Sequence, residues 1–344
     1  MRHQPRDAVR LSMQEAAALG ESALRAGGYD AEQARIVCAH LVDAAACGYA
    51  FAGLPRILEI ADEKRLKQPR HDMKIIQESP VSAMIDGGNH IGYYTVYKAT
   101  QIVIDKAKQS GIAVVGVYDS GLSGRNAYYV EMIARENLVG LQFSGASPIV
   151  APEGGKRPML GTNPLAVSFP TGKHPLVVDM GTAAIMKGEL AIRHRLGESL
   201  PEGVAIDANG KPTCDPVVAM AGSLLAFGAR DKHKGYALSL MVQAFGVLAG
   251  STIPHGRPRD FGHLLIAIKP ELLMPLEQLK QNMDQLLDEI RATPTVDGVI
   301  QVRVPSERAF RERDIAIKDG ILIDRKVVEE LRKMAGRGQA PVQG

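Results

Sequence analysis

Short runs of aliphatic and β-branched residues alternate with helical patterns and glycine-rich turns through the middle of this chain. VSAMIDGG, IAVVGVYDS, VGLQFS and LVVDM each have the length and composition of a strand, and stretches such as NAYYVEMIARENL between them have a helical pattern. This alternation predicts an α/β or α+β fold. No strand is followed by the GxGxxG pattern of the Rossmann fingerprint, so a dinucleotide would need a different construction to bind here.

The charge and hydropathy of the chain exclude several classes of protein. Lys and Arg (41) nearly balance Asp and Glu (38), and the formal net charge is only +3. Nucleic-acid binding needs a concentrated basic face, so we expect none and favour a small anionic ligand. No apolar run approaches the ~20 residues of a membrane span. The N-terminal MRHQPRDAVRLS also lacks the apolar core of a signal peptide, so we expect a cytoplasmic protein.

The cysteines and histidines show no pattern of a disulfide framework or a metal site. Cys38, Cys47 and Cys214 form an odd, sparse set without a CxxC pair, which is typical of free thiols in a reducing compartment. The nine histidines include no HExxH and no paired spacing typical of zinc. We therefore expect no metal site.

Three segments combine glycine with polar groups in a way that suits ligand binding. They are PEGGKRPMLGTNPLAVSFP, VVDMGTAAIMKGELAIRHR and LLAFGARDKHKGYALSLM. The first permits close backbone approach, the second leads into a helix whose N-terminus would favour an anion, and the third places a lysine beside a helix. Each also has a purely structural interpretation, respectively tight turns, a helix cap and a solvated charge run.

Five motifs in these and neighbouring segments resemble a known family. They are LGTNPLAVSFP, VVDMGTAA, LPEGVAIDANGKPTCDP, HKGYALSLM and VPSER. The resemblance runs in order over about residues 10 to 335, and it is to the malate/L-lactate dehydrogenase superfamily, a non-Rossmann group. The stretch from Gly188 to Gly250 is most similar to the Δ1-piperideine-2-carboxylate/Δ1-pyrroline-2-carboxylate reductase branch, although the ureidoglycolate branch shares its loop.

The resemblance implies a fold and an assembly. It implies an α/β (α+β) fold with a largely antiparallel central sheet and a helical N-terminal part, assembled as a homodimer. The expected parts are a helical part at 1–75, a smaller α/β part at 76–120 and 260–335, and a central NAD(P)-binding domain at 121–259. The end of the chain, 336–344, has the composition GRGQAPVQG and is expected to be disordered.

The resemblance also implies NADPH or NADH as the cofactor. The substrate would be a small anion, such as a 2-oxo acid, a 2-hydroxy acid or a cyclic imine carboxylate. By motif match, the residues expected to line the cofactor are Ser147, Thr162, Asn163, Val178, Asp179, Met180, Gly181, Thr182, Ala183, Ala184, His233, Lys234, Ser306, Glu307 and Arg308.

The sequence departs from the family pattern at both usual histidines. The family pattern Gly-x-x-Ser-His-Gly-x-x-Arg supplies a histidine that transfers the proton and an arginine that holds the substrate carboxylate. Here Gly48 and Arg56 keep the frame, but Phe51 and Ala52 replace the serine and the histidine. In the second pattern, Asn-Ser-x-His-Phe-Gly, Leu122 replaces the histidine. The cofactor motifs are kept, whereas the reaction centre is altered.

Several residues are candidates for catalysis. Arg56 is expected to pair with a substrate carboxylate, with a structural ion pair as the alternative. Tyr49 and His90 are candidate replacement acids, and Ser120 with Asp119 could orient a water molecule. The sequence does not choose among them.

The chemistry of the substrate decides how much the missing histidines matter. Ketone reduction creates an alkoxide that needs a proton donor, and general acid catalysis contributes about 10²–10⁴-fold. A cyclic imine can be protonated before hydride arrives, and Phe51 could contact that cation. We therefore expect an NAD(P)H-dependent reductase of a cyclic ketimine carboxylate or a related C=N substrate. The alternatives are a 2-oxo/2-hydroxy acid dehydrogenase with a relocated acid, and a catalytically silent relative that binds cofactor or metabolite.

Overall fold

The structure is a computed structural model that describes residues 7–63, 67–251 and 261–337. Backbone contacts group the chain into two compact units. The helical unit comprises Met1–Pro69, Pro170–Leu176 and Glu277–Gly344, and the sheet unit comprises Arg70–Phe169 and Val177–Leu276. Each unit thus combines segments that are far apart in the sequence.

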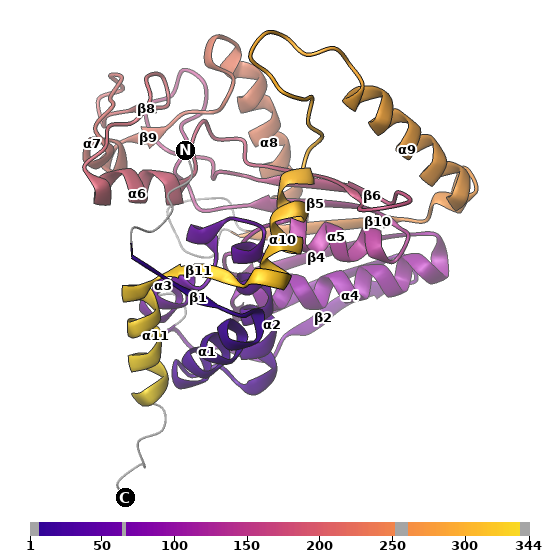
Figure 1. The fold of residues 1–344 in the computed structure, drawn as a ribbon, viewed down its shortest axis with the longest axis horizontal. Coiled ribbons are helices and arrows are strands. Elements are labelled where there is room, and N and C mark those ends of the chain that lie inside the picture. The colour runs from indigo at the N-terminus through magenta and orange to yellow at the C-terminus, as the bar shows by residue number, and fades with distance from the viewer. Residues whose placement is uncertain (1–6, 64–66, 252–260, 338–344) are drawn as a thin grey trace, which may run out of the picture. The chain divides into compact units, whose positions relative to one another are not determined.

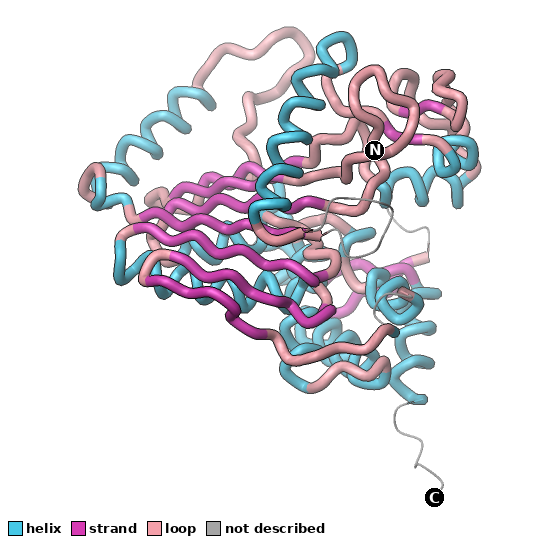
Figure 2. The backbone as a smooth tube through the Cα atoms, turned by 180° about the vertical axis from the view of Figure 1, so that it is seen from behind, coloured by secondary structure: helices cyan, strands magenta, loops and turns pink. Residues whose placement is uncertain are grey.

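Among the described residues, a seven-stranded sheet forms the centre of the sheet unit, in the order β2-β3-β4-β10-β5-β6-β7 (Figures 1 and 2). Its strands are β2 (Lys74–Ser79), β3 (Ser82–His90), β4 (Ile112–Ser120), β5 (Val139–Gly145), β6 (Leu165–Phe169), β7 (Leu176–Met180) and β10 (Gly262–Ile268). The pairs β2–β3, β4–β10, β10–β5 and β5–β6 are antiparallel, whereas β3–β4 is parallel. The expected α/β class with a largely antiparallel sheet is confirmed.

Helices cover both faces of this sheet. α4 (Gly92–Ser110) connects β3 to β4, and it packs with α5 (Ala127–Arg135) on one face, while α8 (Lys232–Leu248) packs on the other. Leu265 is buried in the core under α4 and α5, whereas its neighbour Leu264 is buried in the core under α8. Successive strand residues point to opposite faces, so β10 supplies both cores from one apolar run.

A smaller part of the sheet unit lies beyond β7. Its elements are α6 (Lys187–Leu196), β8 (Ala205–Ile206), α7 (Pro216–Ala221), β9 (Ser223–Leu224) and the 3-10 helix η3 (Ala229–Asp231); another 3-10 helix, η4 (Pro270–Leu272), follows β10. β8 and β9 pair with each other in a separate two-stranded sheet. Val150, Leu190 and Leu224 are buried together in a core of their own.

The helical unit is built mainly of helices. They are α1 (Met13–Ala26), α2 (Ala31–Ala46), the 3-10 helix η1 (Ala50–Ala52), α3 (Pro55–Asp62), α9 (Leu276–Arg291), α10 (Glu307–Asp319) and α11 (Arg325–Arg337), with the strands β1 (Ala8–Leu11) and β11 (Ile321–Asp324) paired antiparallel. Ser12 and Glu15 form a capping box that begins α1, and Asp30 caps α2. The expected helical N-terminal part is therefore confirmed.

The division into three parts stays a prediction. The central sheet takes β3, β4 and β10 from the expected smaller α/β part and β5, β6 and β7 from the expected central domain. α11 ends at Arg337, so the first two residues of the expected tail 336–344 are helical, and 338–344 lie outside the described residues. Cys38, Cys47 and Cys214 are free thiols, as expected.

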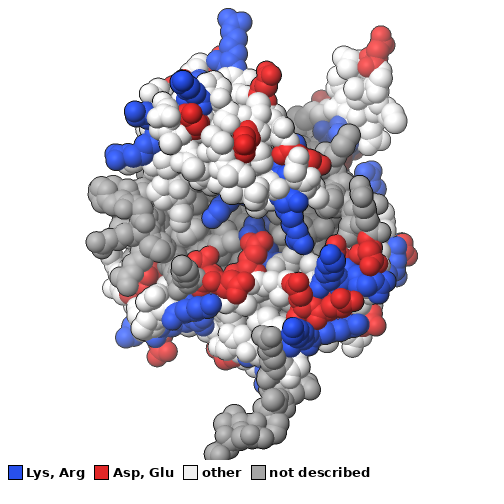
Figure 3. All heavy atoms as spheres, turned by 90° about the vertical axis from the view of Figure 1, so that its left-hand side faces the viewer, with Lys and Arg blue, Asp and Glu red and all other residues white. Residues whose placement is uncertain are grey.

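The distribution of charge on the surface and the length and polarity of the helices concern two kinds of partner, nucleic acids and membranes. In Figure 3 basic and acidic side chains lie interspersed on the face that it presents. Within the described residues, each helix is too short or too polar to cross a membrane.

Candidate cofactor and substrate site

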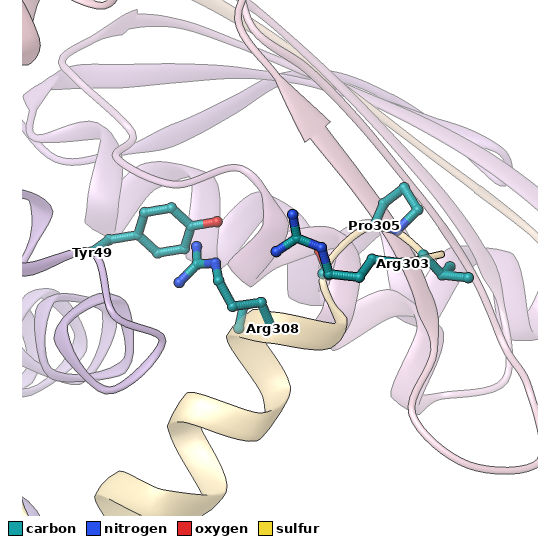
Figure 4. Close-up of a pocket in the computed structure, with 7 residues that line it drawn as sticks. Tyr49, Arg303, Pro305 and Arg308 are labelled. Carbon is teal, nitrogen blue, oxygen red and sulfur yellow. The ribbon is translucent and has the colours of Figure 1, made fainter. Parts of the chain in front are cut away.

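A cavity of about 310 Å³ lies in the helical unit, between the segment after α2 and the start of α10 (Figure 4). Its lining residues are Tyr49, Arg303, Val304, Pro305, Ser306, Arg308 and Ala309. Figure 4 shows the phenol of Tyr49 and the guanidinium of Arg308 side by side, with the guanidinium of Arg303 pointing toward them. Two cations and a hydroxyl therefore border one small space.

Arg308 is held by the segment that carries Tyr49. Its guanidinium carbon lies 4.8 Å from the centroid of the Tyr49 ring, and its Nη1 donates to the carbonyl of Cys47 at 3.2 Å. Cation–π contacts of this kind contribute about 0.5–2 kcal/mol. Gly48 permits the approach, because its φ is +80° and an added Cβ would come 3.0 Å from Arg308 Nη1. Gly48, the glycine of the family pattern, thus leaves space for the guanidinium of Arg308.

The chain enters α10 through a left-handed residue. Ser306 has a φ of +66°, a conformation that non-glycine residues adopt at a cost. The next residue, Glu307, accepts hydrogen bonds from the backbone N–H of Val304 at 3.0 Å and from Arg291 Nε at 2.6 Å. The hydrogen bond that Arg291 donates to Glu307 is the main cause of the raised pKa of Arg291. Glu307 therefore fixes the turn, while Ser306 and Arg308 line the cavity.

The donor set of the cavity fits an anion. Guanidiniums bind carboxylate and phosphate oxygens in pairs, and the N-terminus of a helix such as α10 adds a favourable dipole. A volume of about 310 Å³ is at the small end of ligand sites. The cavity therefore suits a small acid, or one phosphate-bearing part of a nicotinamide dinucleotide.

Arg56 and Phe51 also lie in the segment after α2. Arg56, on α3, forms an ion pair with Glu59 one turn later, so the alternative of a structural ion pair is seen. Its role in holding a substrate carboxylate stays a prediction. Phe51, in η1, is 42% exposed, and so the position that precedes the lost histidine presents an aromatic side chain to solvent.

The other two catalytic candidates lie in the sheet unit and are engaged locally. His90 Nε2 lies 3.1 Å from the carbonyl oxygen of His71, and its ring meets Tyr94 edge-on. Ser120 is fully buried, and its hydroxyl lies 2.5 Å from that of Thr95. The hydroxyl of Ser120 therefore keeps hydrogen-bonding capacity beyond its contact with Thr95, but its burial limits the access of water. The catalytic roles of His90 and Ser120 stay predictions.

Some residues of the expected cofactor stretch 178–184 serve the scaffold. Asp179 Oδ2 accepts from the N–H of Ala127 at 2.8 Å and so caps α5. Burial raises the pKa of Asp179, and the hydrogen bond from Ala127 opposes that shift. Thr182 is fully buried and donates to the carbonyl of Thr162 at 3.1 Å. Ala183 is buried, Val178, Gly181 and Ala184 are half-buried, and Met180 is exposed.

Asn163 is a second scaffold residue. It is fully buried with a φ of +36°, its Oδ1 accepts from the N–H of Ala146, and its Nδ2 donates to the carbonyl of Ser239. Ser147 and Thr162 beside it are half-buried. The amide of Asn163 thus joins two loops to α8, so its expected contact with the cofactor would have to use other atoms.

His233 and Lys234 lie exposed in the first turn of α8. Lys234 Nζ lies 3.8 Å from Asp231 Oδ1, and both side chains are mostly solvated, which makes the pair weak. Both residues are therefore accessible to an anionic ligand. Their expected contact with the cofactor stays a prediction.

A larger cavity of about 950 Å³ lies in the sheet unit beside the start of α8. Four of its lining residues, Gly154, Gly203, Gly210 and Gly228, have positive φ values. Ala184 of the expected cofactor stretch lines it as well. The lining residues come from four segments that the sequence had already singled out, which contain PEGG, VVDMGTAA, LPEGVAIDANG and LLAFGARDK. The sequence could not show that these segments meet in one cavity, because they lie up to 80 residues apart.

Arg303 was also missed from the sequence. It lies three residues before Ser306 in VRVPSER, and the family motif VPSER begins one residue after it, at Val304. A signal existed, since an arginine that close to a predicted anion-binding turn is a natural partner for it.

The comparisons with known proteins agree on the family. The malate/L-lactate dehydrogenase family matches residues 11–332. The malate/(S)-sulfolactate dehydrogenase of Methanothermus fervidus is 35% identical over 336 residues, which cover 94% of this chain and 97% of that protein. The structure of malate dehydrogenase from Pyrococcus horikoshii OT3 matches with a TM-score of 0.87 at 29% identity, covering 98% of each chain.

The expected branch needs adjustment. A Δ1-pyrroline-2-carboxylate/Δ1-piperideine-2-carboxylate reductase of Pseudomonas putida is 33% identical, but over 264 residues that cover 73% of this chain and 74% of that protein. The relative named for malate and sulfolactate has the higher identity, 35% over 94% of this chain, so the comparisons do not single out imine reductases. The chain belongs to the malate/L-lactate dehydrogenase family and is an NAD(P)-dependent oxidoreductase of that family.

Proposed function

We propose that the protein interconverts a small 2-hydroxy acid and its 2-oxo acid, and that Tyr49 is the relocated proton donor. The observation that supports this best is the cavity where Tyr49 lies beside Arg308 and faces Arg303. Relatives named for malate and sulfolactate act on acids with a second anionic group, for which two guanidiniums are suitable partners.

Each residue has a separate task in this proposal. The nicotinamide cofactor, when bound, supplies or accepts the hydride. The hydroxyl of Tyr49 gives a proton to the oxygen of the reduced carbonyl, and takes it back in oxidation. Arg308 and Arg303 hold an anionic group beside it. Of the residues expected at the cofactor from the motifs, Met180, His233 and Lys234 are exposed in the sheet unit, and Ala184 lines its larger cavity.

A substrate panel tests the proposal. NADPH and NADH oxidation would be measured with oxaloacetate, 3-sulfopyruvate and pyruvate, and with Δ1-piperideine-2-carboxylate and Δ1-pyrroline-2-carboxylate. We expect turnover on the 2-oxo acids, highest with a second acidic group. Turnover on the imines alone would refute the proposal in favour of the imine reductase. Tight cofactor binding without turnover on any compound would identify a catalytically silent relative.

Replacing Arg308 tests which anion the cavity holds. Arg308→Ala loses a charge-assisted partner, which is worth about 1.5–3 kcal/mol, or roughly 10–150-fold in a Michaelis constant. A rise confined to the KM of the 2-oxo acid places the substrate in the cavity, and a rise confined to the KM of the cofactor places a phosphate there. Arg56→Ala serves as the matched comparison. A rise confined to the KM of the 2-oxo acid would show that Arg56 leaves Glu59 to hold the substrate.

Imine reduction remains the second candidate because of one observation. Phe51, which precedes the position of the first family histidine, is 42% exposed. Leu122, which occupies the position of the second, is 40% exposed. Each therefore presents an apolar surface within its own unit. Such surfaces suit a substrate that arrives already protonated, and an aromatic ring attracts a cation.

We also propose that the protein forms a homodimer through α8. Its exposed residues Ala237, Leu240, Met241, Ala244, Val247 and Leu248 recur at helical spacing and form an apolar stripe. Leu240 is 49% and Leu248 is 64% exposed. Sedimentation should show a dimer that Leu240→Glu dissociates, while Leu273→Glu, at an 88% exposed leucine outside α8, leaves it intact. Equal effects of the two changes would remove α8 from the interface.

A further inference from the structure

Three potential metal ligands meet at one edge of the central sheet. Asp86 lies on β3, Asp119 lies near the end of β4, and His71 lies in the segment before β2. His71 Nε2 is 3.7 Å from Asp86 Oδ1 and 3.8 Å from Asp119 Oδ2. One ligand atom from each residue lies within 4.8 Å of the other two.

The strand topology brings the two carboxylates together. β3 and β4 are parallel neighbours, so their carboxyl ends reach the same edge of the sheet. Asp86 is paired in register with Tyr118, and Asp119 is the next residue on β4. Their separation of 33 positions in the sequence is therefore closed by the fold, which is why spacing alone indicated no metal site.

The third ligand is positioned by glycine. The N–H of His71 donates to the carbonyl of Gly88 at 3.2 Å. Gly88 has a φ of +63°, and an added Cβ would come 2.1 Å from the carbonyl oxygen of His71. Its own N–H donates to Asp86 Oδ1 at 2.9 Å. One glycine thus fixes both the histidine segment and the orientation of a carboxylate.

The second nitrogen of His71 indicates a ligand. Nδ1 lies 3.1 Å from the carbonyl oxygen of Asp72, and a carbonyl only accepts, so Nδ1 carries a proton. In the neutral ring Nε2 then turns a lone pair toward two carboxylates, an arrangement that is repulsive unless a cation lies between them. Metal-bound histidines commonly donate their other N–H to a backbone carbonyl in this way. The competing explanation is a doubly protonated His71 that bridges the two carboxylates.

We propose that His71, Asp86 and Asp119 bind one first-row divalent metal ion, of the Zn²⁺ or Mn²⁺ class. Ligand bonds of about 2.0–2.2 Å at tetrahedral angles separate neighbouring ligand atoms by about 3.4 Å. The two distances from His71 Nε2, 3.7 and 3.8 Å, need only a small closure, and the two carboxylates, whose ligand atoms lie within 4.8 Å, have to approach each other as they bind the ion. Imidazole favours Zn²⁺ over Mg²⁺, and the carboxylates suit Mn²⁺ as well. The side chains are 52%, 22% and 19% exposed for His71, Asp86 and Asp119, which leaves room for water as the remaining ligands.

Metal binding is tested on the full chain without cofactor or substrate, so the result does not depend on the proposed reaction. Chelator-treated protein is titrated calorimetrically with Zn²⁺, Mn²⁺ and Mg²⁺. We expect one Zn²⁺ per chain, with Mg²⁺ at least ~10-fold weaker. His71→Ala, Asp86→Asn and Asp119→Asn should each weaken Zn²⁺ by at least ~10-fold. His174→Ala is the matched control, because within the described part of the chain His174 forms an ion-pair contact with one carboxylate, Asp314, at 3.8 Å.

Two outcomes would overturn the proposal. One is that the unmodified protein takes up no stoichiometric Zn²⁺, as a protonated His71 bridge would predict. The other is that His174→Ala lowers Zn²⁺ affinity as much as His71→Ala. Because Asp86→Asn keeps an oxygen for the Gly88 N–H, this variant should fold, and circular dichroism checks that. A crystal of the unmodified protein with Zn²⁺ should show an anomalous peak bonded to all three residues, and a peak elsewhere refutes the assignment.

Discussion

The two segments that depart from the expected family pattern present different groups. In the helical unit, the segment from Gly48 to Arg56 contributes Tyr49 to a cavity that Arg308 also lines. In the sheet unit, Leu122 is an exposed leucine, and the carbonyl of Gly121 just before it accepts a hydrogen bond from the buried His263. The first segment therefore presents a polar group at a cavity, whereas the second presents an apolar side chain beside a buried polar network.

The support under the second segment is a buried hydrogen-bond network. His263 is fully buried, its Nε2 donates to the carbonyl of Gly121 at 3.1 Å, and its Nδ1 therefore accepts from the hydroxyl of Ser144 at 3.0 Å. Gln142 and Asn126 donate to the same hydroxyl oxygen at 3.2 Å. This network fixes the backbone carbonyl just before Leu122 through contacts that do not involve the side chain at 122.

The largest expected effect tests whether the first segment has been rebuilt for catalysis. Tyr49→Phe removes only the hydroxyl, so kcat for a 2-oxo acid should fall by about 10²–10⁴-fold with little change in either KM. Steady-state kinetics with saturating cofactor measures it, and Tyr97→Phe is a control tyrosine in the other unit. A fall of less than tenfold would mean that the proton comes from elsewhere.

The next effect concerns the stability of the support. His263→Ala leaves the carbonyl of Gly121 and the hydroxyl of Ser144 without their buried partner and opens a cavity. We expect the free energy of unfolding to fall by about 3 kcal/mol, measured by urea denaturation. Ser144→Ala should cost less, because the imidazole volume remains. If His263→Ala proves neutral, the network does not support the segment.

Placing a histidine in the first segment should give a smaller effect. In the Tyr49→Phe background, Ala52→His adds an imidazole to the same segment and should recover at most about tenfold in kcat for a 2-oxo acid, below the ~10²-fold of a well-placed general acid. On imines Ala52→His should give no improvement. Steady-state kinetics on both substrate classes measures these effects, and a recovery of ~10²-fold or more would show that the segment still positions a histidine for general acid catalysis.

The smallest effect is a pH dependence at the start of α5, next to the same support. Burial raises the pKa of Asp179 above its ordinary value of 3.8, so the folded protein binds more protons than the unfolded chain in that range. Stability from this group is therefore present below the ordinary pKa and is lost as the pH rises through the raised pKa. Asp179→Asn keeps the acceptor for Ala127 and should flatten the urea-unfolding profile across this window. An unchanged slope would contradict this assignment.

Local signals in the sequence predicted much of the fold and part of the site. Ser12, with Glu15 three residues later, is a local signal for the start of α1, and Gly48 marks the end of α2, because capping and positive φ are properties of single residues. The sequence could not show that Ser120 and Asn163 are buried, or that His71 meets Asp86 and Asp119, because these facts depend on which strands become neighbours.

The parallel pairing of β3 with β4 has a consequence for tolerated change. α4 has 19 residues and spans about 28 Å, close to the roughly 30 Å length of the nine-residue β4 along which the chain must return. Inserting or deleting one residue in α4 would rotate its end by about 100° and shift where β4 starts relative to β3. Length variation among natural homologues should therefore spare α4 and accumulate in the loops around β8 and β9.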